Sequence, residues 1–187
     1  MVKRVKIYTK RGDSGETSLI FGTKVSKDHP RIKACGSIDE LNATFGTAIS
    51  FNKEPRIVKI LESIQNELFN IGAEIASQQK LRKNTKEYYQ LNKSKIDGLE
   101  IKIDQYDDKL PPLKTFILPS GTNAAALLHL ARTVCRRAER EVVTLSKNEQ
   151  VNPNILAYLN RLSDLLFVLA RYTNRRSGRK EIPWQKD

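Results

Sequence analysis

The sequence predicts an all-α protein, an up-and-down bundle of about five helices with a ferritin-like four-helix-bundle core and an irregular N-terminal segment. Apolar residues recur at spacings of three and four along several stretches, which is the period of an amphipathic helix. Capping residues and prolines stand where these stretches begin, and short connections join most of them. With 187 residues, no internal repeat and no linker, the chain is expected to form one domain, divided into residues 1–36, 37–176 and 177–187.

The N-terminal part of the chain lacks helical periodicity. Residues 1–36 are expected to be irregular or extended, with one short strand over Val5–Tyr8. Ser37 is followed three residues later by Glu40, which is the pattern of a capping box. We therefore expect the first helix to begin at Ser37 and to end near Phe51.

A second helix is expected directly after Pro55. Residues 77–93 are polar and rich in lysine, and they are expected to form a loop. A shorter helix over residues 95–110 should end before Pro111, because proline cannot continue a helix. The apolar positions of the second helix, at spacings of three and four, are Ile57, Ile60, Leu61, Ile64, Leu68, Ile71 and Ile75.

Two long helices are expected in the C-terminal third. The first runs from about Asn123 to Ser146, and the second begins after Asn152, which is followed by proline at the first helical position, and ends near Arg176. The tail over residues 177–187 contains Trp184, and the sequence leaves open whether this tail is frayed or docked.

Composition narrows the class of protein. The chain is 39% hydrophobic and 29% charged, which is ordinary for a globular protein, and it has no apolar run long enough to span a membrane. A secretory signal is absent from the N-terminal residues, and the two cysteines form no disulfide framework, so a cytoplasmic location is expected. The net charge of +12 indicates an anionic partner, for which nucleic acid, an acidic membrane and a nucleotide all qualify.

The segment before the first helix concentrates glycines, hydroxyl groups and cations. Glycine allows backbone N–H groups to converge on one point, and hydroxyl and cationic side chains add further donors, which suits a polyphosphate. A plain turn is the alternative reading of a Gly-Asp-Ser-Gly run. The segment comprises Thr9, Lys10, Arg11, Gly12, Asp13, Ser14, Gly15, Glu16, Thr17 and Ser18.

Arginines form a stripe on the helix after Thr122. Arg132, Arg136 and Arg140 are spaced by four, with Arg137 beside them. A solvated charged face is one reading of the stripe. The use of arginine in a chain rich in lysine favours the other, because arginine binds phosphate with a bidentate fork.

The last helix carries polar residues within an otherwise apolar sequence. Asn160, Asp164, Phe167 and Arg171 lie on one face, flanked by leucines and valine. Because an unpaired buried polar group costs about 1–3 kcal/mol, we expect partners for them, and the arginines of the preceding helix are suitable. These residues form either part of a ligand site or a salt-bridge network without a ligand.

The sequence contains none of the usual catalytic or nucleotide-binding motifs. His29 and His129 are isolated and are interpreted as structural, and no metal-ligand spacing occurs. The early glycines are not followed by the Gly-Lys-Ser or Gly-Lys-Thr of a Walker loop, and no strand–turn–helix unit supports a Rossmann fold. Any nucleotide must therefore be held in a different way.

Six ordered blocks of the sequence resemble the PduO-type ATP:cob(I)alamin adenosyltransferases. Together they extend over most of the chain, and residues 77–110 carry no such signal. The blocks are Thr9-Lys10-x-Gly12-Asp13-x-Gly15-x-Thr17, Val25-x-Lys27-Asp28-x-x-Arg31, Gly36-x-x-Asp39-Glu40-Leu41-Asn42, Phe116-Ile117-Leu118-Pro119, Ala131-Arg132-x-x-x-Arg136-Arg137-x-Glu139-Arg140 and Leu159-Asn160-Arg161-Leu162-Ser163-Asp164.

The resemblance implies a homotrimer with active sites between subunits. Cob(I)alamin would attack the 5′ carbon of ATP, giving adenosylcobalamin and triphosphate, and Mg²⁺ would accompany ATP. It assigns the segment Thr9–Ser18 and Lys27 to wrapping ATP, and Arg132 to pairing with Asp39 across the subunit boundary. The phosphates would be held by Arg132, Arg136 and Arg137, the nucleotide site would be lined by Glu139 and Asn160, and the corrinoid would lie near Phe116, Asp164 and Phe167.

Two other functions remain open at this point. One is a non-catalytic ATP sensor or cobalamin carrier on the same bundle, and the other is a basic helical nucleic-acid-binding protein, for which the low aromatic content of 7% is unfavourable. Under the enzyme hypothesis, a cobalamin reductase and an adenosylcobalamin-dependent enzyme are expected partners. Neither nucleic acid nor a membrane is then expected to bind.

Overall fold

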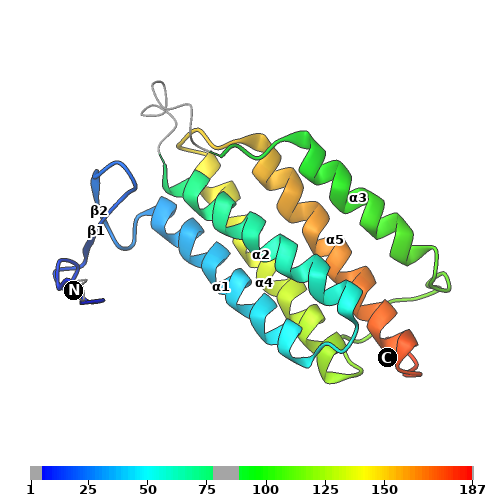
Figure 1. Ribbon diagram of the computed structural model, residues 1–187. Coiled ribbons are helices and arrows are strands. Elements are labelled where there is room, and N and C mark those ends of the chain that lie inside the picture. The colour runs from blue at the N-terminus through cyan, green and yellow to red at the C-terminus, as the bar shows by residue number, and fades with distance from the viewer. Residues whose placement is uncertain (1–5, 78–88, 187) are drawn as a thin grey trace.

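The computed structural model describes residues 6–77 and 89–186 and contains five helices and one small hairpin (Figure 1). This confirms the predicted all-α bundle. The elements are β1 (Glu16–Ser18), β2 (Lys24–Ser26), α1 (Pro30–Phe51), α2 (Pro55–Ala76), α3 (Lys93–Asp107), α4 (Asn123–Ser146) and α5 (Pro153–Arg176).

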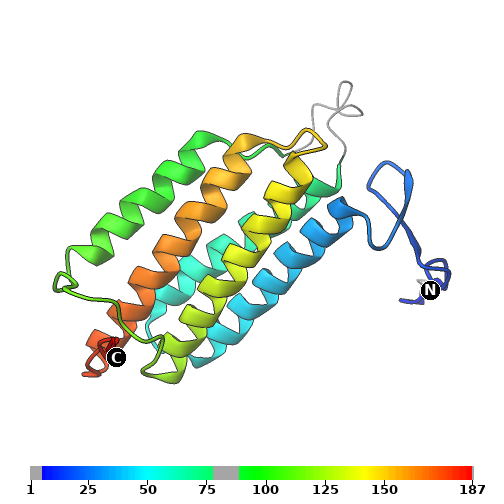
Figure 2. The same ribbon diagram turned by 180° about the vertical axis from the view of Figure 1, so that it is seen from behind.

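The helices alternate in direction along the chain. Helix α1 packs against α2 and α4, α4 also packs against α5, and α3 lies along the outer side of α5 (Figures 1 and 2). The antiparallel pair β1–β2 projects beyond the N-terminal end of α1, away from the helices. Within residues 6–77 and 89–186, no helix is both long and apolar enough to cross a membrane.

The core is formed by the apolar stripes that the sequence indicates. Of the seven predicted apolar positions of α2, all but Ile60 are buried, and Ile60 is half-buried against the core. Helix α5 is buried along much of its length, including Tyr158 and Leu162. The five helices therefore share one continuous hydrophobic core.

Most of the predicted helix boundaries are confirmed. Helices α2, α4 and α5 have the expected bounds, and α3 is shifted by two or three residues at each end from the expected 95–110. Thr122 Oγ1 accepts a hydrogen bond from Ala125 N at 3.2 Å, and Asn152 Oδ1 accepts one from Asn154 N at 3.0 Å, so both act as N-caps. Of the expected loop 77–93, residues 78–88 lie outside the described residues.

The predicted start of the first helix is wrong. Helix α1 begins at Pro30, seven residues before Ser37, and His29 Nδ1 caps it by accepting a hydrogen bond from Arg31 N at 3.2 Å. The buried Arg31 side chain bonds Glu149 and the carbonyl of Ile75, which ties this first turn to the bundle. Ser37 and Glu40 thus form no cap and lie within the helix.

The segment before α1 is also more ordered than expected. Residues 16–18 pair with residues 24–26 as an antiparallel hairpin, in which Thr17 lies opposite Val25. The predicted strand over Val5–Tyr8 is not observed at residues 6–8, and Val5 lies outside the described residues. The C-terminal tail is docked, since Ile117 forms a β-bridge with Pro183.

Candidate functional site

A polar surface crosses the contact between α4 and α5. Asn160 Nδ2 donates to Glu139 Oε1 at 3.3 Å, and Arg161 Nη1 donates to Asn160 Oδ1 at 3.3 Å. Arg161 also pairs with Asp164 at 3.4 Å and with Glu100 of α3 at 2.9 Å. Asn160 therefore links α5 to Glu139 of α4, while Arg161, a residue that sequence reasoning did not assign to the site, links acceptors on α5 to Glu100 of α3.

The partners expected for the α5 residues differ from those observed. Asn160 and Asp164 are exposed, so solvation replaces the buried pairing that we expected. Among the described residues, the arginines of α4 form no hydrogen bond or ion pair with either of them, and the α4 partner of Asn160 is Glu139. Of these α5 side chains only that of Arg171 is buried, and its carboxylate partners lie in α3 and the C-terminal tail.

Arg132 lies half-buried on α4 with incomplete hydrogen bonding. Its Nε is buried and has no hydrogen-bond partner among the described residues. Burial lowers the pKa of Arg132, and the like charge of Arg136 one turn away lowers it further. A guanidinium remains protonated despite such shifts, so the site holds a cation with an unused donor.

His129 lies one turn before Arg132 and is fully enclosed. Both ring nitrogens are buried without a partner among the described residues, and the ring centroid is 5.9 Å from that of Phe167. Burial, with a smaller contribution from Arg132, lowers the pKa of His129 to about 4. The imidazole is therefore neutral at pH 7. In the described part of the chain, no group of three or more histidine, cysteine or acidic side chains could hold a metal ion.

The N-terminal segment folds into a compact turn with a lysine over it. Lys10 and Gly15 adopt positive φ values of 59° and 84°, and Gly15 O accepts a hydrogen bond from Lys27 N at 2.9 Å. A Cβ on Gly12 would lie 3.2 Å from Lys27 Nζ, so the lysine amine sits directly above this glycine. The structure thus brings Gly12, Gly15 and Lys27 together. These residues form a turn, and the same residues are the ones that the sequence suggests for binding a polyphosphate.

The glycine turn and the arginine stripe are far apart within the chain. The hairpin projects from the end of the bundle at which α4 ends, whereas Arg136 lies ten residues, about 15 Å of helix, before that end (Figure 2). Arg137 faces α1 and pairs with Glu40 at 2.5 Å. Within a single chain, the residues that the sequence suggests for ATP binding therefore do not all lie close together.

Arg132 lies on α4, whereas Asp39 lies on α1. It borders a groove of about 270 Å³ between α1 and α2, where Asn42 Oδ1 is buried without a partner among the described residues. Within residues 6–77 and 89–186, Asp39 forms no ion pair, and it does not contact Arg132.

Phe116 precedes α4 and is 79% exposed. Its ring meets that of Trp184 in the C-terminal tail edge to face, with centroids 6.4 Å apart and the planes at 73°. Sequence reasoning did not assign Trp184 to the site, and the only signal was the presence of a single tryptophan in a tail of undecided position.

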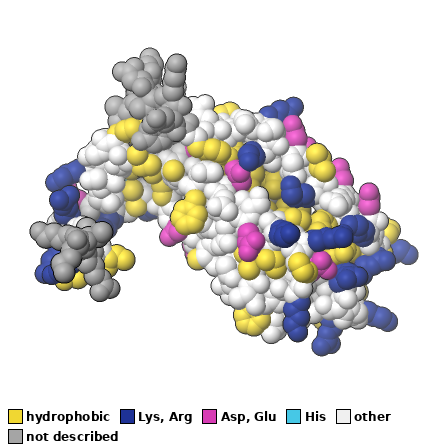
Figure 3. All heavy atoms as spheres, viewed as in Figure 1, with side chains coloured by type: hydrophobic (Ala, Val, Ile, Leu, Met, Phe, Trp, Pro, Cys, Tyr) yellow, Lys and Arg dark blue, Asp and Glu magenta, His cyan; other side chains and the backbone are white. Residues whose placement is uncertain are grey.

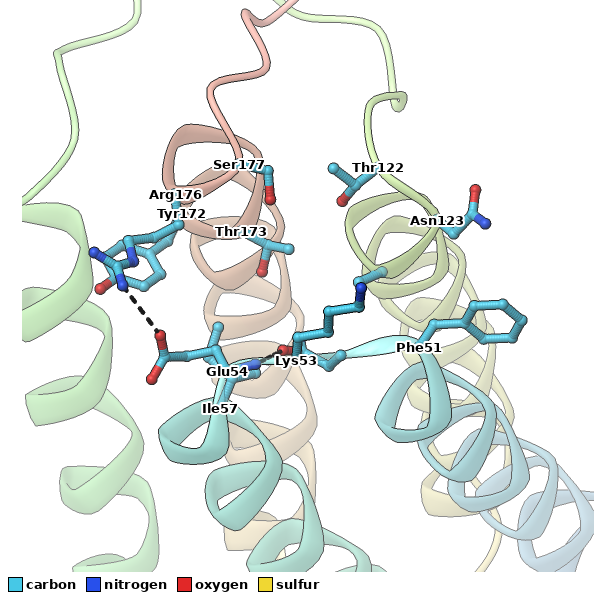
Figure 4. Close-up of a pocket in the computed structure, with 12 residues that line it drawn as sticks. Phe51, Lys53, Glu54, Ile57, Thr122, Asn123, Tyr172, Thr173, Arg176 and Ser177 are labelled. Atoms are coloured by element: carbon cyan, nitrogen blue, oxygen red, sulfur yellow. Dashed lines mark hydrogen bonds and ion pairs between the residues drawn. The ribbon is translucent and has the colours of Figure 1, made fainter.

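A separate cavity of about 500 Å³ opens at the end of the bundle where α2 begins (Figure 4). Lys53 reaches into it from the α1–α2 turn, and Arg176 pairs with Glu54 at 3.7 Å along one edge. None of the residues nominated from the sequence lines this cavity.

Comparison with known proteins identifies relatives along almost the whole chain. The family model described as cobalamin adenosyltransferase matches residues 7–173. The corrinoid adenosyltransferase of Bacillus subtilis is 42% identical over 97% of this chain and 93% of its own, and the human corrinoid adenosyltransferase is 40% identical over 97% and 74%. A variant of the PduO-type ATP:corrinoid adenosyltransferase from Lactobacillus reuteri, solved with cobalamin and ATP, superposes with a TM-score of 0.92 at 38% identity, covering 97% of this chain and 100% of that one.

Proposed function

This chain belongs to the cobalamin adenosyltransferase family, and we propose that its active site is completed only when copies of the chain assemble. The reaction is the transfer of the adenosyl group of ATP to the cobalt of a corrinoid, which forms adenosylcobalamin.

The observation that carries the proposal is the separation of complementary groups. Arg132, whose Nε has no partner among the described residues, lies on α4, and Asp39, which forms no ion pair within residues 6–77 and 89–186, borders the groove between α1 and α2. The hairpin that follows the glycine turn projects beyond the end of the bundle, away from the middle of α4 where the arginine stripe lies (Figure 2). A head-to-tail contact places one face of each copy against the other face of the next, and such contacts can close into a ring. We propose a ring of three, in which Asp39 of one copy meets Arg132 of its neighbour.

In this assembly, ATP would lie between the glycine turn of one copy and α4 of the next. The residues Thr9–Ser18 and Lys27 would enclose the nucleotide, while Arg132, Arg136 and Arg137 contact its phosphates. Arg137 would have to leave Glu40 or share it, which is feasible because both side chains are about half exposed in their ion pair. Mg²⁺ would be held by phosphate oxygens and water, since this ion keeps several waters when it binds nucleotides.

The nucleoside and the corrinoid would occupy the α4–α5 surface. Glu139 and Asn160 offer an acceptor and an amide to the ribose or base. Phe116 lies at the end of the bundle where α4 begins, Asp164 lies near the middle of α5, and Phe167 lies about one turn further toward that end. These three residues would border the corrinoid. The exposed ring of Phe116 would exclude water from one face of the cobalt.

The chemistry needs no general base. Cobalt(I) supplies the electron pair of the new cobalt–carbon bond, and the bond between the 5′ carbon and its oxygen breaks as triphosphate leaves. No proton is transferred in this step. The protein therefore has to orient the ribose and to neutralise the charge that develops on the leaving oxygen, and arginines in a partly buried site suit that task.

Mixed assemblies test the proposal directly. Arg132→Ala and Asp39→Asn should each lower kcat/KM for adenosylcobalamin formation by about 100-fold, while Arg140→Ala, which removes a charge from the same helix, should have little effect. When the two inactive variants are unfolded, mixed and reassembled, about a quarter of the interfaces in a head-to-tail ring pair an intact Asp39 with an intact Arg132. We therefore expect about a quarter of wild-type activity to return.

Failure of the mixture to recover activity, with assembly verified by sedimentation, would refute a shared site. Binding of ATP and corrinoid by the wild-type chain without cobalt–carbon bond formation would instead favour a sensor or carrier. Absorbance of the alkylated corrinoid and release of triphosphate, measured without oxygen, distinguish these outcomes.

A further inference from the structure

The segment that carries Phe116 has little packing of its own. Residues 111–116 are all exposed, and a cavity of about 490 Å³ separates this segment from the start of the C-terminal tail. Asn174 binds the far end of the segment, through Ser120 O at 2.9 Å and Thr122 N at 3.0 Å. The position of the Phe116 ring therefore depends on contacts other than the hydrophobic core.

The C-terminal tail provides those contacts. Leu118 N donates to Ile182 O at 2.8 Å, and Trp184 N donates to Phe116 O at 2.8 Å, so two backbone hydrogen bonds flank the bridge between Ile117 and Pro183. The rings of Phe116 and Trp184 meet edge to face, an arrangement that aromatic pairs favour. The tail thus fixes both the backbone and the ring of Phe116.

A buried arginine in turn fixes the tail. The Arg171 side chain is 4% exposed, and its Nε donates to Glu181 Oε1 at 2.7 Å. Its Nη2 donates to Pro111 O at 2.7 Å, at the start of the Phe116 segment. Arg171 therefore links helix α5, the tail and the Phe116 segment at one point, and a second carboxylate, that of Asp107, lies 3.5 Å from Nη1.

We propose that Trp184 and the Arg171–Glu181 ion pair are positioning residues for Phe116, and that through Phe116 they govern binding and alkylation of the corrinoid. This inference rests on the proposed placement of Phe116 beside the corrinoid. Lysines and arginines gather at this end of the bundle (Figure 3), so Glu181 is a carboxylate in a basic environment, where it pairs with the buried Arg171.

The test uses single substitutions in the full-length protein. Glu181→Gln removes the charge that Arg171 binds, and Trp184→Ala removes the ring against Phe116. We expect each to lower kcat/KM for the corrinoid by roughly tenfold, because misplacement of a substrate-contacting group is costly, while KM for ATP stays unchanged. Trp184→Phe, which keeps an aromatic edge, should restore most of the loss.

Asp107→Asn is the matched control. It removes the other carboxylate of Arg171 without touching the tail, so the corrinoid kinetics should stay at the wild-type level. Trp184 is the single tryptophan of the chain, so its fluorescence reports on the tail alone. Glu181→Gln should shift this emission to longer wavelength and increase its quenching by acrylamide, and Asp107→Asn should change neither.

Phe116→Ala separates this inference from the proposal on which it rests. One outcome is that Phe116→Ala loses corrinoid turnover while Glu181→Gln and Trp184→Ala keep wild-type kinetics. This outcome would overturn the positioning role and leave the active site as proposed. Wild-type turnover in Phe116→Ala would overturn both. The inference would also be refuted if KM for ATP rose in the tail variants by the same factor by which kcat/KM for the corrinoid fell, because that would indicate a general structural effect.

Discussion

His129 should make the folded protein less stable as the pH falls toward 5. This residue is 3% exposed, and burial with the nearby Arg132 lowers its pKa from 6.5 to about 4, against a small opposing effect of Glu181. The unfolded chain therefore binds a proton at a pH where the folded chain does not. Stability from this group is complete above pH 6.5, falls as the pH drops below that value, and levels off below about 4.

The size of the effect follows from the two pKa values. A depression from 6.5 to about 4 corresponds to about 3 kcal/mol when the whole range is crossed. Between pH 7 and pH 5 the linkage relation gives a loss of about 2 kcal/mol. Urea unfolding at fixed protein concentration measures it, because concentration affects the stability of an assembling protein.

Other groups also titrate in this range, so the comparison needs a variant. His129→Leu has a similar volume and removes the titrating group together with two unpaired buried nitrogens. Between pH 7 and pH 5, wild type should lose about 2 kcal/mol more unfolding free energy than this variant, because only wild type carries the titrating imidazole. Parallel pH profiles, or a native His129 that titrates near 6.5 by NMR, would refute the reasoning.

Two substitutions test the contacts that hold the ends of the bundle. Gly121→Ala should lower the unfolding free energy by about 2 kcal/mol, because φ is +121° and the added Cβ would overlap the buried Asn174 amide, which already binds two backbone groups. Arg31→Ala should cost about 3 kcal/mol, since it leaves Glu149 and a buried carbonyl without their donor. Urea midpoints measure both, and an unchanged midpoint in either variant would contradict the corresponding contact.

Local patterns predicted most of the helices because the required information is local. Helix α2 shows an uninterrupted apolar stripe, and Asn152-Pro153 marks the start of α5 unambiguously. The start of α1 was missed because its first turn is held by Arg31, whose ion pair with Glu149 joins residues 118 positions apart. A capping-box pattern at Ser37 and Glu40 then suggested a boundary where the helix simply continues.

Helical spacing in the sequence shows which candidate site residues share a helix face, but it does not show the contacts between distant segments. Spacings of three and four nominated Arg132, Asn160 and Asp164 from sequence alone. The bond between Asn160 and Glu139 requires knowledge of how α4 and α5 are aligned, which no single helix contains. The docking of Trp184 against Phe116 depends on a two-residue bridge, too short to leave a periodic signal.

The arrangement of Arg132 and Arg136 favours a ligand whose negative charge increases during the reaction. Like charges one helical turn apart repel each other, and burial of Arg132 reduces the water available to screen them. A polyphosphate bound as proposed would remove this repulsion and would bond the Arg132 Nε, which has no partner among the described residues. In the proposed site, negative charge would accumulate at the triphosphate as the bond to the leaving oxygen breaks, so these guanidinium groups would interact more strongly with the transition state than with bound ATP, which is the condition for accelerating the step.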